Sequence, residues 1–364
     1  MKKELLKEKE ELLEYIMKNF IEISEFYEGK YEEEVSQILE KLLLEKKEAC
    51  TKLLDWMTRH FLMNNLERKF DLSQFFEILK GLEDGLDLEQ IKIYARPEFS
   101  EFKMEQIRLG LKNGLDIDKV NLYAKPEFTS GQMEQIRLGF EAGLSIEQVK
   151  LYANPKFIDV QMQEIRLGLE NGLSMEEVKL YANPSFSALA MREIKLGFEN
   201  KLSPEQIKLY ATNEFYPEEM REIRLGFLNG LSLEQVKLYA NPIFDRDQMR
   251  EIRFGFENGL SMEQVKLYAK PEFNWVQMAE IRLGLEKGLN VEQVKLYADP
   301  KFNANQMREI RWGLENGLSI EEVKKYAKPE LSWVKMQDIR QKLERKLKEK
   351  NKTTKKKNRM EFKR

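Results

Sequence analysis

Residues 133–161 read Met-Glu-Gln-Ile-Arg-Leu-Gly-Phe-Glu-Ala-Gly-Leu-Ser-Ile-Glu-Gln-Val-Lys-Leu-Tyr-Ala-Asn-Pro-Lys-Phe-Ile-Asp-Val-Gln. Variants of this segment follow one another along most of the chain, because its opening motif begins at Met104 and returns at every 29th residue as far as Met336. No insertion or deletion breaks the register, and a degenerate copy begins at Phe75. Such a fixed period is the signature of a repeat architecture.

The first half of the segment predicts a helix of about 12 residues. Met133, Ile136, Phe140 and Leu144 have the spacing of one apolar stripe on a helix. Gly143 stands where a helix commonly ends on a residue with positive φ. The helix should therefore stop at this glycine.

The second half predicts another helix, of about 10 residues. Ser145 and Gln148 have the spacing of a capping box, and Pro155 ends the helical pattern. No part of the segment alternates polar and apolar residues as a strand would. The unit is therefore a pair of helices, and the fold class is all-α.

A single helix pair cannot bury its apolar face, so the pairs must stack and share a core. We therefore expect an α-solenoid of nine to ten 29-residue, two-helix repeats. Each first helix carries an internal glycine such as Gly139, which costs about 1 kcal/mol relative to alanine. This glycine predicts a close approach between helix backbones. Lys201 replaces the glycine between the two helices of one unit, so that unit should be the weakest.

The regions outside the regular repeats differ in composition. Residues 1–74 show leucine and isoleucine stripes among many charges, which predicts two or three helices that form an N-terminal cap for the solenoid of residues 75–340. Residues 341–364 hold 12 basic and 3 acidic side chains. We expect Met336–Lys350 to continue as a terminal helix, and we expect residues 341–364 to form a basic, disordered tail. The solenoid itself is acidic.

Composition argues against most catalytic chemistry. The 364 residues include one cysteine, Cys50, and one histidine, His60, so a disulfide or a Cys/His metal cluster lacks its ligands. No Gly-rich phosphate loop, paired-carboxylate pocket or Ser/His/Asp arrangement occurs. We expect no enzymatic activity, no cofactor, no metal and no small-molecule substrate.

The chain also lacks the sequence features of a membrane or secreted protein. No run of about 18 apolar residues occurs. The N-terminal residues are charged and show no apolar segment of a signal peptide. We expect a cytoplasmic protein with no membrane partner.

The units differ most in the three residues that precede each first helix. Residues that pack between repeats must stay the same, whereas residues that do not pack can vary and contact a partner. Aromatic side chains on a rigid scaffold are typical of protein interfaces. Random drift on a solvent-exposed edge would explain the variation equally well. The candidate partner-binding residues are Phe102, Val160, Tyr216, Arg246, Trp275 and Trp333.

Recurrent arginines form a second candidate site, a ladder that could follow phosphates along a nucleic-acid strand. These are Arg108, Arg137, Arg166, Arg224, Arg253, Arg282 and Arg311, with Arg340 in the last unit. The alternative is a row of ion pairs with the acidic ladder Glu89, Asp118, Glu147, Glu176, Glu205, Glu234, Glu263, Glu292 and Glu321. We favour the ion pairs, because the solenoid carries more acidic than basic residues.

Two further ladders recur with the same period. The tyrosines from Tyr94 to Tyr326 could stack on bases, but we expect them to pack in the core with their hydroxyl groups at the surface. The lysines from Lys92 to Lys324 are expected on a solvated face. The basic tail, with Lys355, Lys356 and Lys357, is a further candidate for nucleic-acid contacts.

The segment Leu-Ser-Pro-Glu-Gln-Ile at residues 202–207 resembles the first helix of TAL-effector repeats. That resemblance implies nucleic-acid binding through one loop residue per repeat. The matching loop positions here are Glu98, Glu127, Lys156, Ser185, Glu214, Ile243, Glu272, Lys301 and Glu330. The whole unit is also similar to helical-repeat proteins of unknown function encoded on bacterial mobile elements, which implies a mobile-element or phage context.

These features predict a non-enzymatic scaffold that binds another protein along the variable edge or the concave face of the array. The alternative is a nucleic-acid-binding repeat protein that uses the arginine and lysine ladders or the basic tail.

Overall fold

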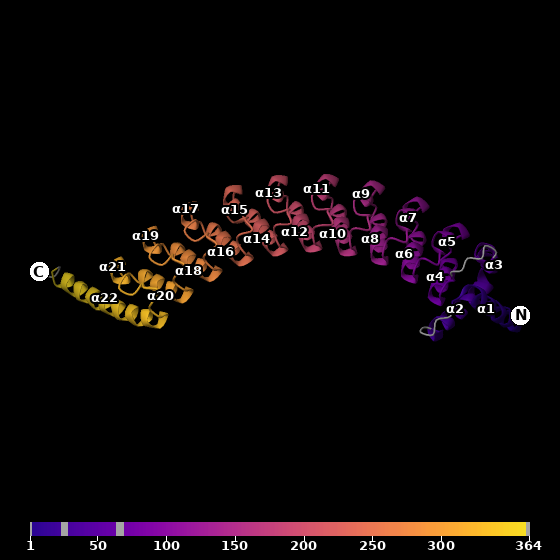
Figure 1. Cartoon of the computed structure of the whole chain (residues 1–364), viewed down its shortest axis with the longest axis horizontal. Helices are drawn as coiled ribbons and strands as arrows, with labels where there is room; N and C mark the ends of the chain where they lie inside the picture. The colour runs from indigo at the N-terminus through magenta and orange to yellow at the C-terminus, as the bar shows by residue number, and fades with distance from the viewer. Residues whose placement is uncertain (1, 23–27, 63–68, 362–364) are drawn as a thin grey trace. The chain divides into compact units, whose positions relative to one another are not determined.

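The computed structural model describes residues 2–22, 28–62 and 69–361, and the chain is all-helical over these ranges (Figure 1). No strand occurs within them, and an isolated β-bridge joins Ile21 to Phe70. The predicted all-α class is confirmed. The chain divides into two compact units, Met1–Met191 and Arg192–Arg364, which we call the N-terminal and C-terminal units.

The N-terminal unit begins with a helical cap and continues with alternating long and short helices. The cap comprises α1 (Lys2–Phe20), α2 (Glu28–Glu45), α3 (Lys47–Met57) and the π-helical turn η1 (Thr58–Leu62). The helices that follow are α4 (Leu72–Glu83), α5 (Leu88–Tyr94), α6 (Glu101–Lys112), α7 (Ile117–Tyr123), α8 (Ser130–Glu141), α9 (Ile146–Lys150), α10 (Asp159–Glu170) and α11 (Met175–Lys179). The boundary between the units falls within α12 (Ala188–Glu199).

The C-terminal unit repeats the same alternation and ends on one extended helix. Its helices after α12 are α13 (Pro204–Lys208), α14 (Pro217–Leu228), α15 (Leu233–Tyr239), α16 (Arg246–Glu257), α17 (Met262–Val265), α18 (Trp275–Glu286), α19 (Val291–Val294), α20 (Ala304–Glu315), α21 (Ile320–Val323) and α22 (Trp333–Glu361).

Within each unit the long helices pack on one another and the short helices line one side of them (Figure 1). In the N-terminal unit α4, α6, α8 and α10 form one continuous layer, and in the C-terminal unit α14, α16, α18, α20 and α22 do the same. The short helix α15 contacts both α14 and α16. Each unit therefore buries its core by stacking helix pairs.

The pair α16 and α17 shows how the sequence produces one repeat. Asp245 caps α16 and forms a capping box with Gln248. Gly259, with a φ of 86°, ends the long helix, and Ser261 caps the short one. Met249, Ile252, Val265, Tyr268 and Phe273 are all buried.

The capping box predicted at Ser145 and the positive φ predicted at Gly143 are likewise confirmed.

The short helices are shorter than predicted, with four to seven residues each. The helix α9 shows the reason. After Lys150 the backbone tightens, because Leu151 donates to Gln148 at 3.1 Å and Tyr152 donates to Val149 at 3.1 Å, three residues back in each case. Pro155 then keeps Asn154 out of the helical region.

The recurrent glycine of the long helix accommodates a tyrosine side chain. A Cβ placed on Gly255 would lie 1.8 Å from Oη of Tyr268, which follows the short helix of the same repeat. The other such glycines meet the equivalent tyrosine hydroxyl at 1.9–2.1 Å, and they are Gly81, Gly110, Gly139, Gly168, Gly197, Gly226, Gly284 and Gly313. The predicted approach between two backbones is therefore wrong. The glycine opens a notch for a side chain.

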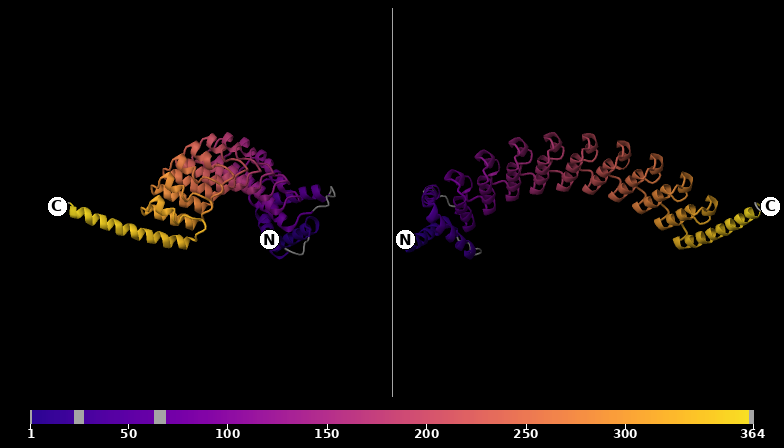
Figure 2. Two further views of the ribbon diagram at one scale, coloured as in Figure 1. Left: turned by 60° about the vertical axis from the view of Figure 1, so that its left-hand side comes forward. Right: turned by 180° about the vertical axis from the view of Figure 1, so that it is seen from behind.

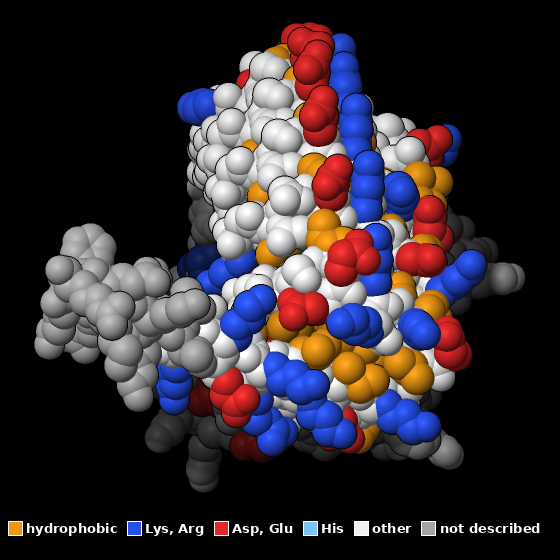
Figure 3. Space-filling model, turned by 90° about the vertical axis from the view of Figure 1, so that its left-hand side faces the viewer, with side chains coloured by type: hydrophobic (Ala, Val, Ile, Leu, Met, Phe, Trp, Pro, Cys, Tyr) orange, Lys and Arg blue, Asp and Glu red, His pale blue; other side chains and the backbone are white. Residues whose placement is uncertain are grey.

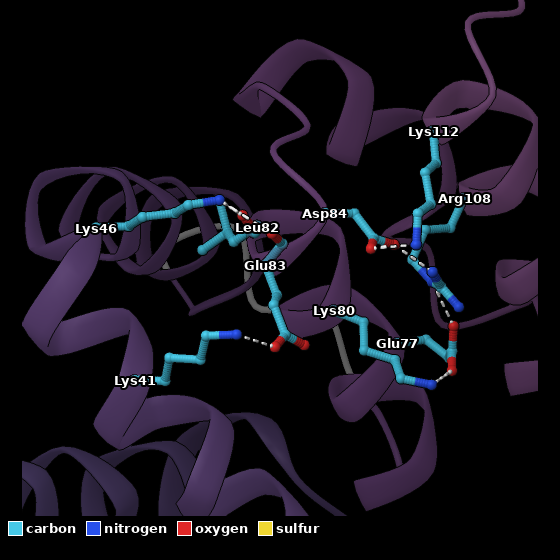
Figure 4. Close-up of polar contacts among 9 residues, drawn as sticks. All are labelled: Lys41, Lys46, Glu77, Lys80, Leu82, Glu83, Asp84, Arg108 and Lys112. Carbon is cyan, nitrogen blue, oxygen red and sulfur yellow. Dashed lines mark hydrogen bonds and ion pairs between the residues drawn. The ribbon is translucent and has the colours of Figure 1, made fainter.

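The N-terminal cap covers α4, the first long helix of the repeats (Figure 4). Nζ of Lys46 donates to the carbonyl oxygens of Leu82 at 2.6 Å and Glu83 at 3.0 Å, at the C-terminal end of α4. Lys41 of α2 forms an ion pair with the Glu83 side chain at 2.7 Å. Cations at this end satisfy unpaired carbonyls and favour the helix dipole. Among the described residues, α1, α2, α3 and the π-helical turn η1 precede α4.

The last helix, α22, is one unbroken helix of 29 residues (Figure 2). The backbone is helical to Glu361, past the predicted helix end at Lys350 and through most of the segment predicted as a tail. Lys342 and Lys346 occupy the places where other repeats have glycine, so nothing stops this helix. Over the described residues no helix combines the length and apolar character that crossing a membrane requires.

Lys201 is the only described residue other than glycine with a positive φ, at 64°. We expect Lys201→Gly to stabilise the turn between α12 and α13 by about 1 kcal/mol, because glycine adopts this conformation without a Cβ clash. Hydrogen exchange at the amides of Lys201 and Leu202 should slow. The reverse swap, Gly230→Lys, should speed exchange at the equivalent turn between α14 and α15. Unchanged exchange in Lys201→Gly would show that this turn is not strained.

Candidate functional site

The residues that vary between repeats lie at the N-terminal ends of the long helices. We call this the variable edge, defined as the N-cap residue of each long helix and the two residues after it. Tyr216 caps α14, and Arg246, Trp275 and Trp333 are the first residues of α16, α18 and α22. Phe102 and Val160 are the second residues of α6 and α10.

Most of the exposed large hydrophobic side chains of the described residues lie on this edge. Tyr216 is 73% exposed and Phe102 is 60% exposed, values that a side chain under packing constraint would not show. The predicted aromatics are joined by aliphatic residues that sequence reasoning did not single out. In the N-terminal unit the set is Phe102, Ile158, Val160 and Leu189, and in the C-terminal unit it is Tyr216, Trp275, Trp333 and Val334.

A buried glutamine holds the edge in place in most repeats. In α16, Oε1 of Gln248 accepts the amide of Asp245 at 2.9 Å, and Nε2 donates to the carbonyl oxygens of Pro271 at 3.4 Å and Phe273 at 2.7 Å. One side chain thereby joins its own helix start to the loop of the next repeat. The glutamines that do so are Gln74, Gln132, Gln161, Gln248, Gln277 and Gln306. The bridge therefore fixes the backbone beneath Val160, Arg246 and Trp275.

Glu219 takes the place of this glutamine in α14. Its carboxylate accepts the amide of Tyr216 at 2.9 Å, but it has no N–H group to donate to the next loop. Burial raises the pKa of Glu219, and the negative charges of Asp245 and Glu218 add to that effect against the opposing hydrogen bond from Tyr216. The edge is thus held less firmly beside Tyr216 than at the helices that carry the glutamine.

The arginine ladder lies inside the stack. Nε of Arg253 donates to Glu222 of the preceding long helix at 3.0 Å, and Nη1 donates to Glu257 of its own helix at 2.6 Å. The same two directions recur at Arg137, Arg166, Arg282, Arg311 and Arg340, with a glutamine as the inter-repeat partner of Arg137 and Arg166. Arg108 differs, because both of its partners, Glu77 and Asp84, belong to α4 and its C-cap. Arg224 bonds to Glu193 at 2.9 Å. Figure 4 shows the first member, Arg108, between Glu77 and Asp84.

These arginines are ion-pair partners, as favoured, but not with the acidic ladder that contains Glu89. Glu89 instead pairs with Lys92 on its own short helix at 2.6 Å, and Glu321 pairs with Lys324 at 3.0 Å. The side chains of Arg108 and Arg253 are only 5% and 7% exposed, which leaves them little surface to offer a phosphate.

Electrostatics keep the buried arginines charged. Burial lowers the pKa of Arg253, but the hydrogen bonds and charges of Glu257 and Glu222 outweigh it and raise the pKa above its ordinary value. Removing one partner of a buried ion pair strands the other charge, at a cost of about 3–5 kcal/mol. The arginine ladder is therefore part of the inter-repeat packing.

The tyrosine ladder is entirely internal. Tyr94, Tyr123, Tyr152, Tyr181, Tyr210, Tyr239, Tyr268, Tyr297 and Tyr326 are all 0% exposed. The expectation of surface hydroxyl groups is wrong, because each hydroxyl enters the glycine notch of its long helix. Burial raises the pKa of Tyr268. No base could stack on these rings without unfolding the repeat.

The surface charges of the array are mixed in sign. Lys92, Lys179 and Lys324 each pair with a glutamate three residues before them on a short helix. On the face shown in Figure 3, acidic and basic side chains stand in adjacent files and do not separate into one positive surface. Lys355, Lys356 and Lys357 lie in the part of α22 whose side chains fall outside the described residues.

The lone histidine and cysteine take structural positions. The His60 ring stacks on Trp56 with centroids 5.3 Å apart. Cys50 is buried, and this burial raises the pKa of its thiol to about 11, so it is a poor nucleophile. Within the described residues, no group of His, Cys, Asp and Glu side chains is placed to hold a metal ion.

Comparison with known proteins adds no family. No family model, curated protein or solved structure matches this chain.

We expect Glu219→Gln to stabilise the α14–α16 junction at pH 7 by about 1 kcal/mol, because the amide supplies the missing donor. The pKa of Glu219 is raised in the folded state, so the folded protein binds more protons than the unfolded one just above the ordinary glutamate pKa. Wild-type stability should therefore fall as pH rises through that window, and the variant should lack this fall.

Hydrogen exchange around Phe244, measured from acidic to neutral pH, tests both expectations. Glu234→Gln is the matched control, because Glu234 is exposed on α15 and does not contribute to the pKa of Glu219, and it should behave like the wild type. Equal protection and equal pH dependence in Glu219→Gln and the wild type would contradict the role given to this carboxyl.

Proposed function

We propose that this chain is a non-enzymatic binding scaffold, an α-solenoid of nine to ten 29-residue repeats that engages another protein through its variable edge. The observation that carries the proposal is a separation of roles between positions. The apolar residues, tyrosines and arginines that the repeats share are buried in packing and ion pairs, whereas exposed hydrophobic side chains gather where the repeats differ.

The chemistry of the edge favours a protein partner. Tryptophan, tyrosine and arginine are the residues that most often dominate binding energy at protein interfaces. Trp275, Trp333, Tyr216 and Arg246 are all of these types, and all lie on helix starts. Because glutamine bridges fix the backbone beneath Arg246 and Trp275, little conformational entropy would be lost at these two residues on binding.

The remaining chemistry is consistent with a scaffold. The groups with perturbed pKa values include buried tyrosines and arginines that hold the repeats together. We propose a cytoplasmic protein, and the similarity of its unit to repeats encoded on bacterial mobile elements supports a mobile-element or phage context.

Nucleic-acid binding through α22 is a second candidate. The observation in its favour is that the basic segment continues as a helix to Glu361. Residues 341–364 carry a net charge of +9, and such a segment attracts phosphates without reading sequence. The buried arginine ladder takes no part in this candidate.

Affinity capture from a bacterial lysate after nuclease treatment tests the proposal. We expect the tagged full chain to retain a protein, and Trp275→Ala combined with Trp333→Ala to reduce its recovery by about tenfold or more. Val291→Ala, which shortens an exposed apolar side chain on the short helix α19, is the control and should leave recovery unchanged.

Two results would contradict the proposal. One is a set of captured proteins that does not depend on the two tryptophans. The other is capture of nuclease-sensitive material alone, lost when residues 341–364 are removed, which would establish the nucleic-acid candidate instead.

A further inference from the structure

One position on the outer face of the long helices changes its charge between the two units. It is the residue directly after the methionine that opens each repeat motif. In the N-terminal unit it is Glu105, Glu134 and Gln163. In the C-terminal unit it is Arg192, Arg221, Arg250, Ala279, Arg308 and Gln337. Because glutamate, glutamine, alanine and arginine all occur there, packing does not dictate the choice.

The arginines at this position are accessible. Arg192 and Arg221 are exposed, and among the described residues neither takes part in an ion pair. Arg250 is 31% exposed and pairs with Asp247 at 3.0 Å. Arg308 is 39% exposed and pairs with Glu280 at 2.8 Å. They differ in this from the buried arginine ladder.

An apolar stripe runs beside these arginines. Four residues further along each helix, and so on the same face, stand the partly exposed side chains of Leu225, Phe254, Leu283 and Trp312. The guanidinium carbon of Arg253 lies 4.7 Å from the centre of the Phe254 ring, and that of Arg340 lies 5.4 Å from the Trp312 ring. The buried arginines therefore hold the rings of Phe254 and Trp312 in place.

The face also connects with the variable edge. The guanidinium carbon of Arg250 lies 5.9 Å from the centre of the Trp275 ring, a cation–π contact between α16 and α18. Trp275 is one of the two tryptophans of the edge that the proposed function gives a role in binding. A ligand seated on the tryptophan would therefore meet Arg250.

We propose that this arginine face, formed by Arg192, Arg221, Arg250 and Arg308 with the stripe Leu225, Phe254, Leu283 and Trp312, binds an acidic segment of the partner protein that also carries apolar side chains. The inference rests on the proposed function and names the chemistry of the partner. Exposed guanidinium groups beside apolar side chains complement carboxylates that alternate with hydrophobic residues.

A peptide fits this face better than a nucleic acid does. The exposed guanidinium groups of Arg192 and Arg221 attract carboxylates and phosphates alike, so the apolar stripe decides between the two ligands. Two of its four members, Leu225 and Leu283, are aliphatic, and they can pack against apolar side chains of a peptide but cannot stack on bases as aromatic side chains do. The N-terminal unit provides an internal contrast, since Glu105 and Glu134 would repel an acidic ligand.

The test uses the full chain and three fluorescein-labelled probes of equal length in fluorescence anisotropy. The first is a peptide in which Glu and Asp alternate with Leu and Trp. The second has Gln and Asn in place of the acids, and the third is single-stranded oligodeoxythymidylate. The variant is Arg192→Glu with Arg221→Glu, which places glutamate at this position, as at Glu105 and Glu134 of the N-terminal unit. The control, Lys237→Glu with Lys266→Glu, makes the same charge change on exposed lysines of the short-helix side.

We expect the acidic peptide to bind the wild type about tenfold more tightly than either other probe, and the arginine variant to lose about tenfold in affinity while the lysine control does not. The inference is overturned if the acidic peptide does not bind, if it binds no better than its amide analogue, or if both variants weaken it equally. It is also overturned if the oligonucleotide binds best and depends on Arg192 and Arg221.

Failure of this inference is distinguishable from failure of the proposed function. If capture of a protein depends on the two tryptophans but is unchanged in the variant Arg192→Glu with Arg221→Glu, the role of the arginine face is contradicted. The proposed scaffold function is then still supported. Loss of tryptophan dependence itself removes both.

Discussion

The insertion of one tyrosine into one glycine notch sets the geometry of each repeat. Tyr268 shows the arrangement, because its hydroxyl donates to the backbone carbonyl of Glu251 at 3.3 Å and lies against Gly255. A helix surface without a side chain at that point is the only one that lets the ring enter fully. The pair fixes how the short helix crosses the long one, and the same pair recurs with the 29-residue period.

Two other contacts carry this geometry from one repeat to the next. Arginines such as Arg253 bridge to the preceding long helix, and glutamines such as Gln248 bridge to the following loop. Both contacts are made by buried side chains, so these positions are needed for packing. The helix starts and the residue after the repeat methionine are not needed for packing, and the exposed aromatic side chains and arginines lie at these positions. Buried packing contacts and exposed variable side chains therefore belong to different positions of the same 29-residue unit.

Much of the fold could be predicted from the sequence. Capping boxes and glycines such as Gly143 determine where helices begin and end through local contacts, and the 29-residue period shows that the same helix pair recurs. The partner of each buried arginine could not, since Arg253 and Glu222 are 31 residues apart and meet only through the stacking of repeats. The role of the internal glycine was predicted wrongly. The sequence shows that a glycine lowers helix propensity, but it does not show that a tyrosine hydroxyl fills the space where a Cβ would be. The exposed aromatics of the edge were predicted from variation between units. Comparison of the units at every position would also have revealed the change from Glu134 to Arg192 and Arg221.

The most direct measurement of the central constraint is a double-mutant cycle on the notch, with Gly255→Ala and Tyr268→Phe followed by urea unfolding. We expect Gly255→Ala to cost about 1–3 kcal/mol, because its Cβ would overlap the hydroxyl. We expect Tyr268→Phe to cost about 1 kcal/mol, and the double variant to recover at least about 1 kcal/mol relative to the sum. Additive losses would contradict the account, because they would show that the glycine is needed for a reason other than the tyrosine hydroxyl.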